Sequence, residues 1–261
     1  MAGYRHGKAS SPSTVVRGNR RGAGLRVAWT ILSCAVVVCL VFALAVWPAG
    51  LVWVAALQQS AELGLLRPAL LGAVLVPIYL MFALALMACS TLATRLLGWR
   101  VAAGVDTRVT DFDWPLLDWV RQMVLTHVVR VCAGTLLRAT PLWTMYLRMN
   151  GARLGKGVYI NSLGVSDHHL LEFGNHVVVG GAAHISGHTV ENGRLRTAPV
   201  RLGDHVVVGT GSVVGIGVEI GSGCQIGALT FVPKFTKLPP NTAYFGVPLH
   251  VRHPPDSRAS S

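Results

Sequence analysis

The sequence predicts a mainly β protein: a parallel β-helix of about four coils, preceded by a two-helix transmembrane hairpin and an amphipathic helix. Three observations predict this fold class. Apolar residues recur every six positions between Leu202 and Leu238. Two long uncharged segments, residues 27–47 and 68–93, precede them. Hydrophobic residues make up 52% of the 261-residue chain, with a mean hydropathy of +0.50, which is too apolar for an ordinary soluble domain.

The first 26 residues form a basic leader. They contain six positive charges and no acidic residue, namely Arg5, Lys8, Arg17, Arg20, Arg21 and Arg26. Their Gly, Ser and Arg content predicts disorder and attraction to anionic lipid headgroups. No aromatic residues alternate with the charges in the way that would indicate nucleic-acid binding, so we expect no nucleic-acid partner.

Residues 27–98 are expected to form the transmembrane hairpin. The 21 uncharged residues of 27–47, at about 1.5 Å per residue, would cross a hydrocarbon core of roughly 30 Å. Residues 68–93 do so again, with Pro77 as a kink. A cleaved signal peptide is the alternative for the first segment. The basic leader predicts a cytoplasmic N-terminus, so the rest of the chain would face the cytoplasm from the inner or plasma membrane.

Residues 99–150 are expected to form an amphipathic helical linker. Asp113 is a plausible N-cap before Pro115, and the helix would end before Pro141. Three arginines spaced along this helix make it too polar to span a membrane. We therefore expect it to lie on the membrane surface or to pack on the hairpin.

The hexad repeat predicts the β-helix over residues 151–253, followed by a tail, 254–261. The repeat positions are Leu154, Ile160, Phe173, Val179, Ile185, Leu202, Val208, Val214, Ile220, Ile226, Val232 and Leu238. Three short strands of six residues make one coil of about 18 residues, in which each apolar residue stacks on its counterpart one coil later. Coils are expected at 154–172, 173–190, 202–219 and 220–237, with residues 191–201 as an excursion loop.

Glycine often follows the apolar residue of a hexad, where the chain turns tightly. The five cysteines contain no CxxC pair, and three lie in apolar segments. This indicates small buried residues rather than disulfides or a zinc site.

The repeat resembles the hexapeptide-repeat acyltransferases, and in particular the maltose, galactoside and serine type of O-acetyltransferase. The residues that carry the resemblance are "LGKGVYIN" at 154–161, "GH" at 187–188, the loop sequence "ENGRLRTAPVRLG", and "LPPNTAYFGVPLHVR" at 238–252. The resemblance implies a left-handed β-helix, a homotrimer with sites between neighbouring solenoids, and acetyl-CoA as acyl donor with no metal. It also implies that His188 is the catalytic base and that Asn161 helps to form the acceptor site.

The same resemblance suggests where coenzyme A lies. Gly246 to Pro248 is similar to the segment that borders the coenzyme A tunnel. The basic residues Lys234, Lys237 and Arg252 could bind its phosphates, and a solvated basic edge is an equal alternative. The candidate cofactor-binding residues are Gly209, Gly227, Ala228, Lys234, Gly246 and Pro248.

The region from the amphipathic helix through "YLRMNGARLGKGVYI" is also similar to the membrane-embedded C-terminal part of poly-lysine synthetase-like nonribosomal peptide synthetases. No adenylation domain is found in this sequence. This second resemblance leaves the substrate open.

Acyl transfer from a thioester to a hydroxyl needs a base, and histidine suits this task at neutral pH. His188 is therefore expected to be catalytic, and the alternative is a surface-turn histidine. Asn161 would orient the acceptor, and Glu191 would orient the imidazole. Asp167 is expected to be an exposed turn carboxylate, and the alternative is a contact with an acceptor hydroxyl. His184 is expected to be structural, and the solvent-facing hexad positions are expected to hold His168, His169 and His205.

Two functional interpretations fit these residues. The first is a membrane-anchored, acetyl-CoA-dependent O-acyltransferase that acylates a hydroxyl on a sugar, an envelope glycolipid or a secondary metabolite, with membrane lipid, coenzyme A and the acceptor as its partners. The second is a noncatalytic trimeric scaffold or partner domain of a membrane peptide-synthetase system. A β-helix carbonic anhydrase with a three-histidine zinc site is disfavoured, because the pair His184 and His188 has no correctly spaced third ligand.

Overall fold

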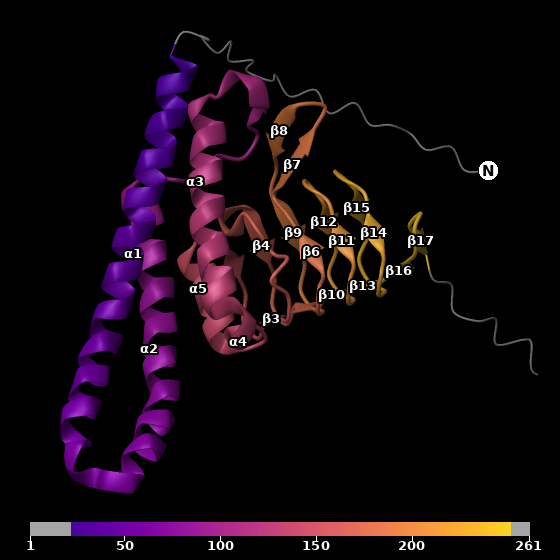
Figure 1. The fold of residues 1–261 in the computed structure, drawn as a ribbon. Helices are drawn as coiled ribbons and strands as arrows, with labels where there is room; N and C mark the ends of the chain where they lie inside the picture. Colours follow the sequence, from indigo (N-terminus) through magenta and orange to yellow (C-terminus); the bar gives the residue numbers. More distant parts are fainter. Residues whose placement is uncertain (1–21, 252–261) are drawn as a thin grey trace, which may run out of the picture.

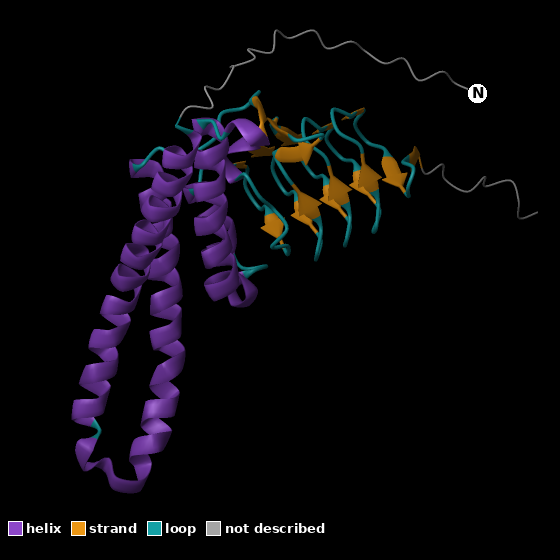
Figure 2. Cartoon of the chain, turned by 45° about the horizontal axis from the view of Figure 1, so that its top comes forward, coloured by secondary structure: helices purple, strands orange, loops and turns teal. Residues whose placement is uncertain are grey.

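The computed structural model describes residues 22–251. Most of the expected leader (1–21), the candidate Arg252 and the expected tail lie outside the described residues. Within them, two long helices stand beside a second group of helices, and a stack of short strands follows (Figures 1 and 2).

The two long helices are α1 (Ala23–Gln59) and α2 (Arg67–Leu96), joined by the short 3-10 helix η1 (Ala61–Leu66). They pack side by side, and η1 closes one end of the pair (Figure 1). Both are long and apolar enough to cross a membrane, as judged by length and composition. Large apolar side chains on α1 are exposed, for example Leu44 at 61% and Trp47 at 70%.

Helix α1 is longer than the expected span of residues 27–47. It has 37 residues, which at 1.5 Å per residue is about 55 Å. The reason is that no charged residue occurs between Arg26 and Glu62, and Pro48 is accommodated inside the helix. An α1 of this length exceeds a hydrocarbon core of roughly 30 Å.

The linker forms several elements instead of one helix. They are β1 (Asp106–Arg108), η2 (Val109–Asp111), α3 (Trp114–Val129), the π-helical turn η3 (Arg130–Gly134), α4 (Thr135–Leu137) and α5 (Pro141–Met149). The chain leaves the helical conformation at Ala139, whose φ is +64°, and the Thr140 side chain caps α5 by accepting from Trp143 N. Asp113 is the residue before α3, but its carboxylate accepts from Thr107 Oγ1 rather than capping the helix. Helix α3 packs against both α1 and α2 (Figure 1).

The β-helix is built from short strands whose order in each sheet shows the stacking of coils. One parallel sheet has the order β15-β12-β9-β4-β2, a second runs β16-β13-β10-β5-β3 with β17 added antiparallel at its end, and a third has the order β14-β11-β6. The strands are β2 (Arg153–Leu154), β3 (Tyr159–Ile160), β4 (Leu171–Phe173), β5 (Val178–Val179), β6 (His184–Ile185), β9 (Val200–Leu202), β10 (Val207–Val208), β11 (Val213–Val214), β12 (Glu219–Ile220), β13 (Gln225–Ile226), β14 (Phe231–Val232), β15 (Lys237–Leu238), β16 (Ala243–Phe245) and β17 (His250–Val251).

The hexad residues form the axis of this stack, as the period of six predicts. Ile220 pairs with Leu202 and Ile226 with Val208, each one coil apart. All of the hexad residues are buried except Leu154, which is half-buried at the first strand. Burying a side chain of this size contributes about 1.5–3 kcal/mol relative to its exposed state, so every residue of the axial stack favours the folded domain.

The segment 191–201 is not a simple loop. The strands β7 (His188–Glu191) and β8 (Arg194–Thr197) form an antiparallel hairpin, and β1 adds to its edge. The turn is Asn192-Gly193, with φ of +49° and +68°, which is the left-handed pair that a two-residue hairpin turn requires. Because β1 belongs to the linker, the hairpin ties the β-helix to the helical part of the chain.

Candidate active site

His188 begins the first strand of this hairpin, and its imidazole is held by a buried carboxylate. His188 Nδ1 lies 2.5 Å from Oδ2 of Asp167. The Asp167 side chain is 1% exposed and that of His188 is 18% exposed. A buried acid fixing one ring nitrogen of a partly exposed histidine is the arrangement that orients a general base.

Asp167 Oδ2 is also the acceptor for groups around the imidazole. It accepts from Gly187 N at 3.1 Å and from Ser186 Oγ at 3.2 Å. Burial disfavours the charged form of Asp167, but the hydrogen bond and charge of His188 outweigh it, so the pKa of the carboxyl lies below its usual value. Asp167 therefore stays ionised at neutral pH and can stabilise a protonated imidazole.

Steric crowding explains why glycine precedes His188. A Cβ at position 187 would come within 2.8 Å of Leu170 Cβ and 3.1 Å of Asp167 Cβ. Asp167 itself has a φ of +51°, in the left-handed region that Asp tolerates better than most residues. Glycine at 187 therefore lets the hairpin strand approach Asp167 closely enough for the carboxylate to reach the ring.

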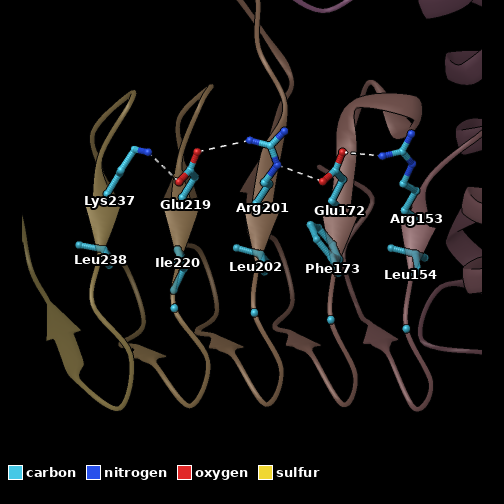
Figure 3. Close-up of a pocket in the computed structure, with 14 residues that line it drawn as sticks. Arg153, Leu154, Glu172, Phe173, Arg201, Leu202, Glu219, Ile220, Lys237 and Leu238 are labelled. Atoms are coloured by element: carbon cyan, nitrogen blue, oxygen red, sulfur yellow. Dashed lines mark hydrogen bonds and ion pairs between the residues drawn. The ribbon is translucent and has the colours of Figure 1, made fainter. Parts of the chain in front are cut away.

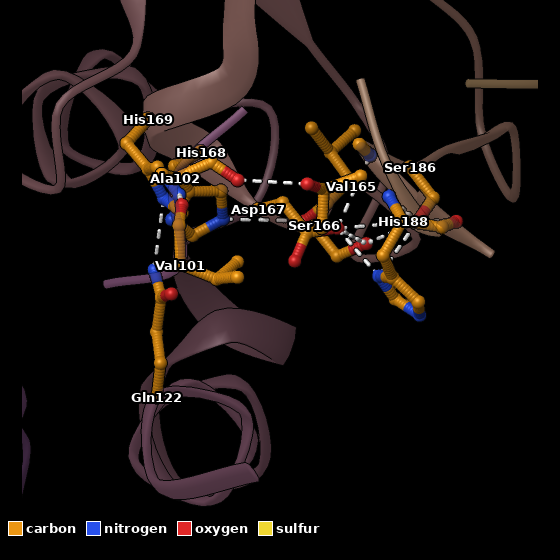
Figure 4. Close-up of polar contacts among 12 residues, drawn as sticks. Val101, Ala102, Gln122, Val165, Ser166, Asp167, His168, His169, Ser186 and His188 are labelled. Carbon is orange, nitrogen blue, oxygen red and sulfur yellow. Dashed lines mark hydrogen bonds and ion pairs between the residues drawn. The ribbon is translucent and has the colours of Figure 1, made fainter. Parts of the chain in front are cut away.

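The indole of Trp119, on α3, packs edge-on against the imidazole of His188, with ring centroids 4.7 Å apart. This contact restricts the rotation of the imidazole. The ring hydrogen bonds of His188 to Ser186 and Asp167 are made by Nδ1 (Figure 4), and no hydrogen bond of Nε2 is found within the described residues. The nitrogen that would accept a substrate proton is therefore unengaged.

The structure corrects the environments expected for three residues. Asp167 is buried rather than an exposed turn carboxylate. His168 is 1% exposed, and its Nε2 lies 3.2 Å from Val165 O. His169 Nε2 lies 2.7 Å from the Val101 carbonyl (Figure 4). They are covered because this coil carries the extra turn η4 (His168–Leu170), which breaks the hexad spacing and packs against the helical layer.

Burial lowers the pKa of His168 to about 4 and also lowers that of His169. Both histidines are thus neutral at pH 7 and have structural roles. His205 is exposed and stacks on His176 at 5.1 Å, in keeping with the solvent-facing position expected for it.

Glu191 does not contact the imidazole that it was expected to orient. Its exposed carboxylate accepts from Lys234 Nζ instead, because Glu191 lies three residues further along the hairpin strand. The orienting carboxylate is Asp167. Lys234, expected to bind a coenzyme A phosphate, is thereby already paired with an acid.

Lys237 belongs to a ladder of alternating charges on the sheet formed by β15, β12, β9, β4 and β2 (Figure 3). The members occupy the position before the stacked apolar residue in successive coils and are Arg153, Glu172, Arg201, Glu219 and Lys237. Each neighbouring pair is 2.9–3.3 Å apart. Exposed pairs of this kind contribute at most about 1 kcal/mol each, and Lys237 is not a free cation.

Asn161 lies at the corner that follows β3, where its N–H donates to Val179 O. No hydrogen bond joins it to His188 within the described chain, and the two residues follow different strands of the coil, β3 and β6. Within one protomer these two residues are therefore not hydrogen-bonded to each other.

The other candidate coenzyme A residues differ in their hydrogen bonding and position. Gly209 and Gly227 donate their N–H groups to Ile226 O and Tyr244 O. A Cβ on Gly209 would also lie 2.5 Å from Ala228 N, so this glycine is required by coil stacking. Ala228 is exposed, and no residue among 22–251 accepts from its N–H. Gly246 and Pro248 lie in the turn between β16 and β17.

No group of three or more His, Cys, Asp or Glu side chains in the described residues could hold a metal ion. The five cysteines are all free thiols. Cys34 and Cys224 are buried as expected, but Cys39 is exposed and Cys89 and Cys132 are half-buried, because they lie on outer faces of the helices.

Sequence reasoning missed Asp167, Ser186 and Trp119. The available signal was the irregular "VSDHHL" at 165–170, where an acid and two histidines interrupt the hexads. An interruption of a regular repeat indicates a functional insertion, and here it supplies the acid that holds His188. Trp119 gave no such signal, because only the tertiary packing of α3 brings it to the site.

No protein-family model matches the chain. A curated relative is the delta-poly-L-ornithine synthetase of Acinetobacter baumannii, 24% identical over 160 residues, which cover 60% of this chain and 12% of that protein. The chain thus matches only about an eighth of that protein's length.

Several solved acetyltransferases are similar in structure. The serine acetyltransferase of Neisseria gonorrhoeae is 19% identical, with 69% of this chain and 58% of that chain covered and a TM-score of 0.39. A hexapeptide-repeat-containing acetyltransferase of Vibrio cholerae, complexed with acetyl coenzyme A, is 22% identical, with 40% and 60% covered and a TM-score of 0.36. A galactoside acetyltransferase in complex with coenzyme A is 23% identical, with 45% and 72% covered and a TM-score of 0.34. The structural neighbours are thus hexapeptide-repeat acetyltransferases, although all of these TM-scores are below 0.5.

Proposed function

We propose that this protein is a membrane-anchored O-acyltransferase that uses acetyl-CoA and has His188 as its general base. The observation that carries the proposal is the 2.5 Å contact between His188 Nδ1 and the buried Asp167 carboxylate, with Nε2 left without a partner in the described chain. A surface-turn histidine would not need a carboxylate that is 1% exposed behind it.

In the proposed reaction His188 Nε2 accepts the proton of an acceptor hydroxyl while the oxygen attacks the thioester carbonyl. The ionised Asp167 stabilises the imidazolium that forms. When the C–S bond breaks, the imidazolium returns this proton to the departing thiolate, so the products are the acyl ester and free coenzyme A. A positioned base of this kind is worth about 10²- to 10⁴-fold in rate.

Acetyl-CoA as the donor is the expectation of the hexapeptide-repeat resemblance. The Ala228 N–H, from which no described residue accepts, is suited to donate to a pantetheine amide or to the developing oxyanion. Because Asn161 and Ala228 lie at the coil corners after β3 and β13, and His188 lies after β6, the proposed site is completed by a neighbouring protomer of a trimer. Asn161 then orients the acceptor.

Membrane anchoring is supported by the two helices that are long and apolar enough to cross a membrane. The proposal includes insertion in the inner or plasma membrane with the β-helix in the cytoplasm, since the leader is strongly basic. An anchor of this kind would keep the base near acceptors in the membrane.

The test uses the full-length protein in detergent or nanodiscs, with acetyl-CoA and extracted membrane lipids as acceptors. Release of free thiol is followed, and binding of coenzyme A is measured by calorimetry. Wild type should release thiol, and His188→Ala should lower the rate at least 100-fold with its trimer and coenzyme A affinity retained. Failure of wild type both to turn over and to bind coenzyme A would favour the scaffold interpretation.

A further inference from the structure

An apolar groove begins beside the catalytic histidine and runs along α1. Its first part has a volume of about 430 Å³ and lies between α1, α3 and the hairpin. Trp119, which packs on the His188 ring, lines it, and so does Val190 of β7, two residues beyond His188. His188 itself does not line the groove, so this end of the groove lies one side chain, Trp119, away from the imidazole.

The groove continues away from the site. A second hollow of about 390 Å³ lies between α1 and α3 and reaches Val38. The two hollows share the lining residues Thr30, Ile31 and Val120, so they adjoin each other, and we call the pair the α1–α3 channel. Apart from the Thr30 hydroxyl, which donates to the Arg26 carbonyl, the lining side chains of this α1–α3 channel are apolar or aromatic along its course.

The length of the channel fits one hydrocarbon chain. From Val27 to Val38 the rise along α1 is about 16 Å at 1.5 Å per residue, which is roughly half of a 30 Å hydrocarbon core. Val38 is also about 32 Å from Gln59 at the closed end of the helix pair. A bilayer core that covers α1 from Gln59 therefore ends near Val38, which lies at the end of the channel farther from His188.

The α1–α3 channel thus extends from the lipid-facing part of α1 to Trp119, the residue that packs on the His188 ring. Resting on the proposed function, we infer that the channel holds the hydrocarbon chain of a bilayer lipid whose head-group hydroxyl lies at His188, so that the acceptor is a membrane lipid. An apolar chain is the matching ligand because the channel offers no charged side chain to pair with a polar ligand. The basic leader, with six charges in 26 residues, does not have the composition to fill it.

Two neighbouring residues of α1 provide a matched pair of variants. Ile31 lines both hollows, whereas Leu32 lines neither. Their exposed fractions are similar, 65% and 57%. Ile31→Trp fills the channel, and Leu32→Trp makes the same kind of change on the same helix outside it. Neither side chain is in the core, so both variants are expected to fold.

The experiment uses full-length protein in phosphatidylcholine nanodiscs that contain a diacylglycerol with a diazirine in one acyl chain. After irradiation, peptide mapping should find label on residues 112–120 of the channel in wild type. Ile31→Trp should reduce this label at least tenfold, and Leu32→Trp should leave it within twofold. A diazirine-labelled palmitoyl-CoA is tested in parallel, and labelling by this donor in place of diacylglycerol overturns the inference.

Turnover of acetyl-CoA and binding of coenzyme A, measured in the same preparations, separate the lipid site from the proposed function. Channel labelling without turnover or coenzyme A binding supports the lipid site and overturns the proposed function. Two results would overturn the lipid channel but not the proposed acyltransferase. One is turnover in wild type with no label in the channel. The other is equal label and equal turnover rates in Ile31→Trp and wild type. Both loss of label and a tenfold or greater loss of turnover in Ile31→Trp support the lipid acceptor.

Discussion

The role of Asp167 leads to a quantitative prediction for Asp167→Asn. Gly187 N–H donates to Oδ2, the same oxygen that meets His188 Nδ1. The amide of asparagine would therefore place its oxygen, not its NH2 group, at this position, because two donors cannot face each other there. The imidazole keeps its Nδ1–H tautomer, and Nε2 stays able to accept a proton.

What Asp167→Asn removes is the negative charge. Hydrogen bonds to charged groups contribute about 1.5–3 kcal/mol and neutral ones about 0.5–1.5 kcal/mol, so the imidazolium loses roughly 1–2 kcal/mol of stabilisation. At 1.36 kcal/mol per tenfold this is a fall in kcat of about 5- to 30-fold. Asp167→Ala also removes the oxygen that orients the ring, so its kcat should be lower than that of Asp167→Asn and closer to that of His188→Ala.

The assay is initial-rate release of coenzyme A thiol, with Glu172→Gln as a control for changing one carboxylate to an amide on an exposed face. This control should keep the wild-type rate within twofold, because its ion pairs are exposed. A wild-type rate in Asp167→Asn would refute the role of the charge. A loss in Asp167→Asn equal to that of His188→Ala would refute the assignment of the tautomer.

Three further predictions concern Trp119, Glu191 and Gly209. Trp119→Ala should lower kcat several-fold by releasing the imidazole, and Trp119→Phe should restore most of it, since an aromatic pair contributes about 0.5–1.5 kcal/mol; circular dichroism checks that both fold. Glu191→Gln should leave the thiol-release rate within twofold, and a loss as large as that of Asp167→Ala would reinstate Glu191 as the orienting acid. Gly209→Ala should lower the free energy of unfolding by about 1–3 kcal/mol, because the added Cβ would lie 2.5 Å from the backbone of the next coil. The control is Gly181→Ala, whose Cβ would have its nearest neighbour at 3.7 Å. Thermal unfolding should show a lower midpoint for Gly209→Ala and an unchanged midpoint for Gly181→Ala.

The pH dependence of the free energy of unfolding should include a contribution from Asp167. Its pKa is lowered in the folded protein, so its contribution is complete above the unfolded value of about 3.9. That contribution is lost as the pH falls through the folded value. The difference in thermal midpoint between wild type and Asp167→Asn should therefore narrow below about pH 4. A constant difference down to pH 2 would contradict an ionised Asp167.

The stacked part of the fold could be predicted because its signal is local and repeated. Each hexad residue reports one buried position, and the pairing of Ile220 with Leu202 follows from the period alone. The coil at 162–170 could not be predicted in this way. Its chain is longer than a hexad allows, and its burial comes from helices that pack on it from elsewhere in the sequence, as the contact of His169 with Val101 shows.

The sequence singled out His188 as a candidate but did not predict the carboxylate that contacts it. The sequence "GH" before a loop indicated a histidine at a turn, and the resemblance gave it a role. From the sequence, Glu191 was the acid expected to orient the imidazole because it is near His188 in the chain, and Asp167 was expected to be an exposed turn carboxylate. The structure favours Asp167 because parallel stacking of coils places residues about 20 positions apart side by side, whereas three residues along a strand point a side chain elsewhere.

The most direct measurement of the central claim is a cryo-electron microscopy structure of the full-length protein with coenzyme A bound. The account predicts the thiol of coenzyme A beside His188 Nε2, in a crevice between protomers that also contains Asn161 of a neighbouring chain. Coenzyme A bound away from His188, or an imidazole enclosed by its own chain with no such crevice beside it, would contradict the account.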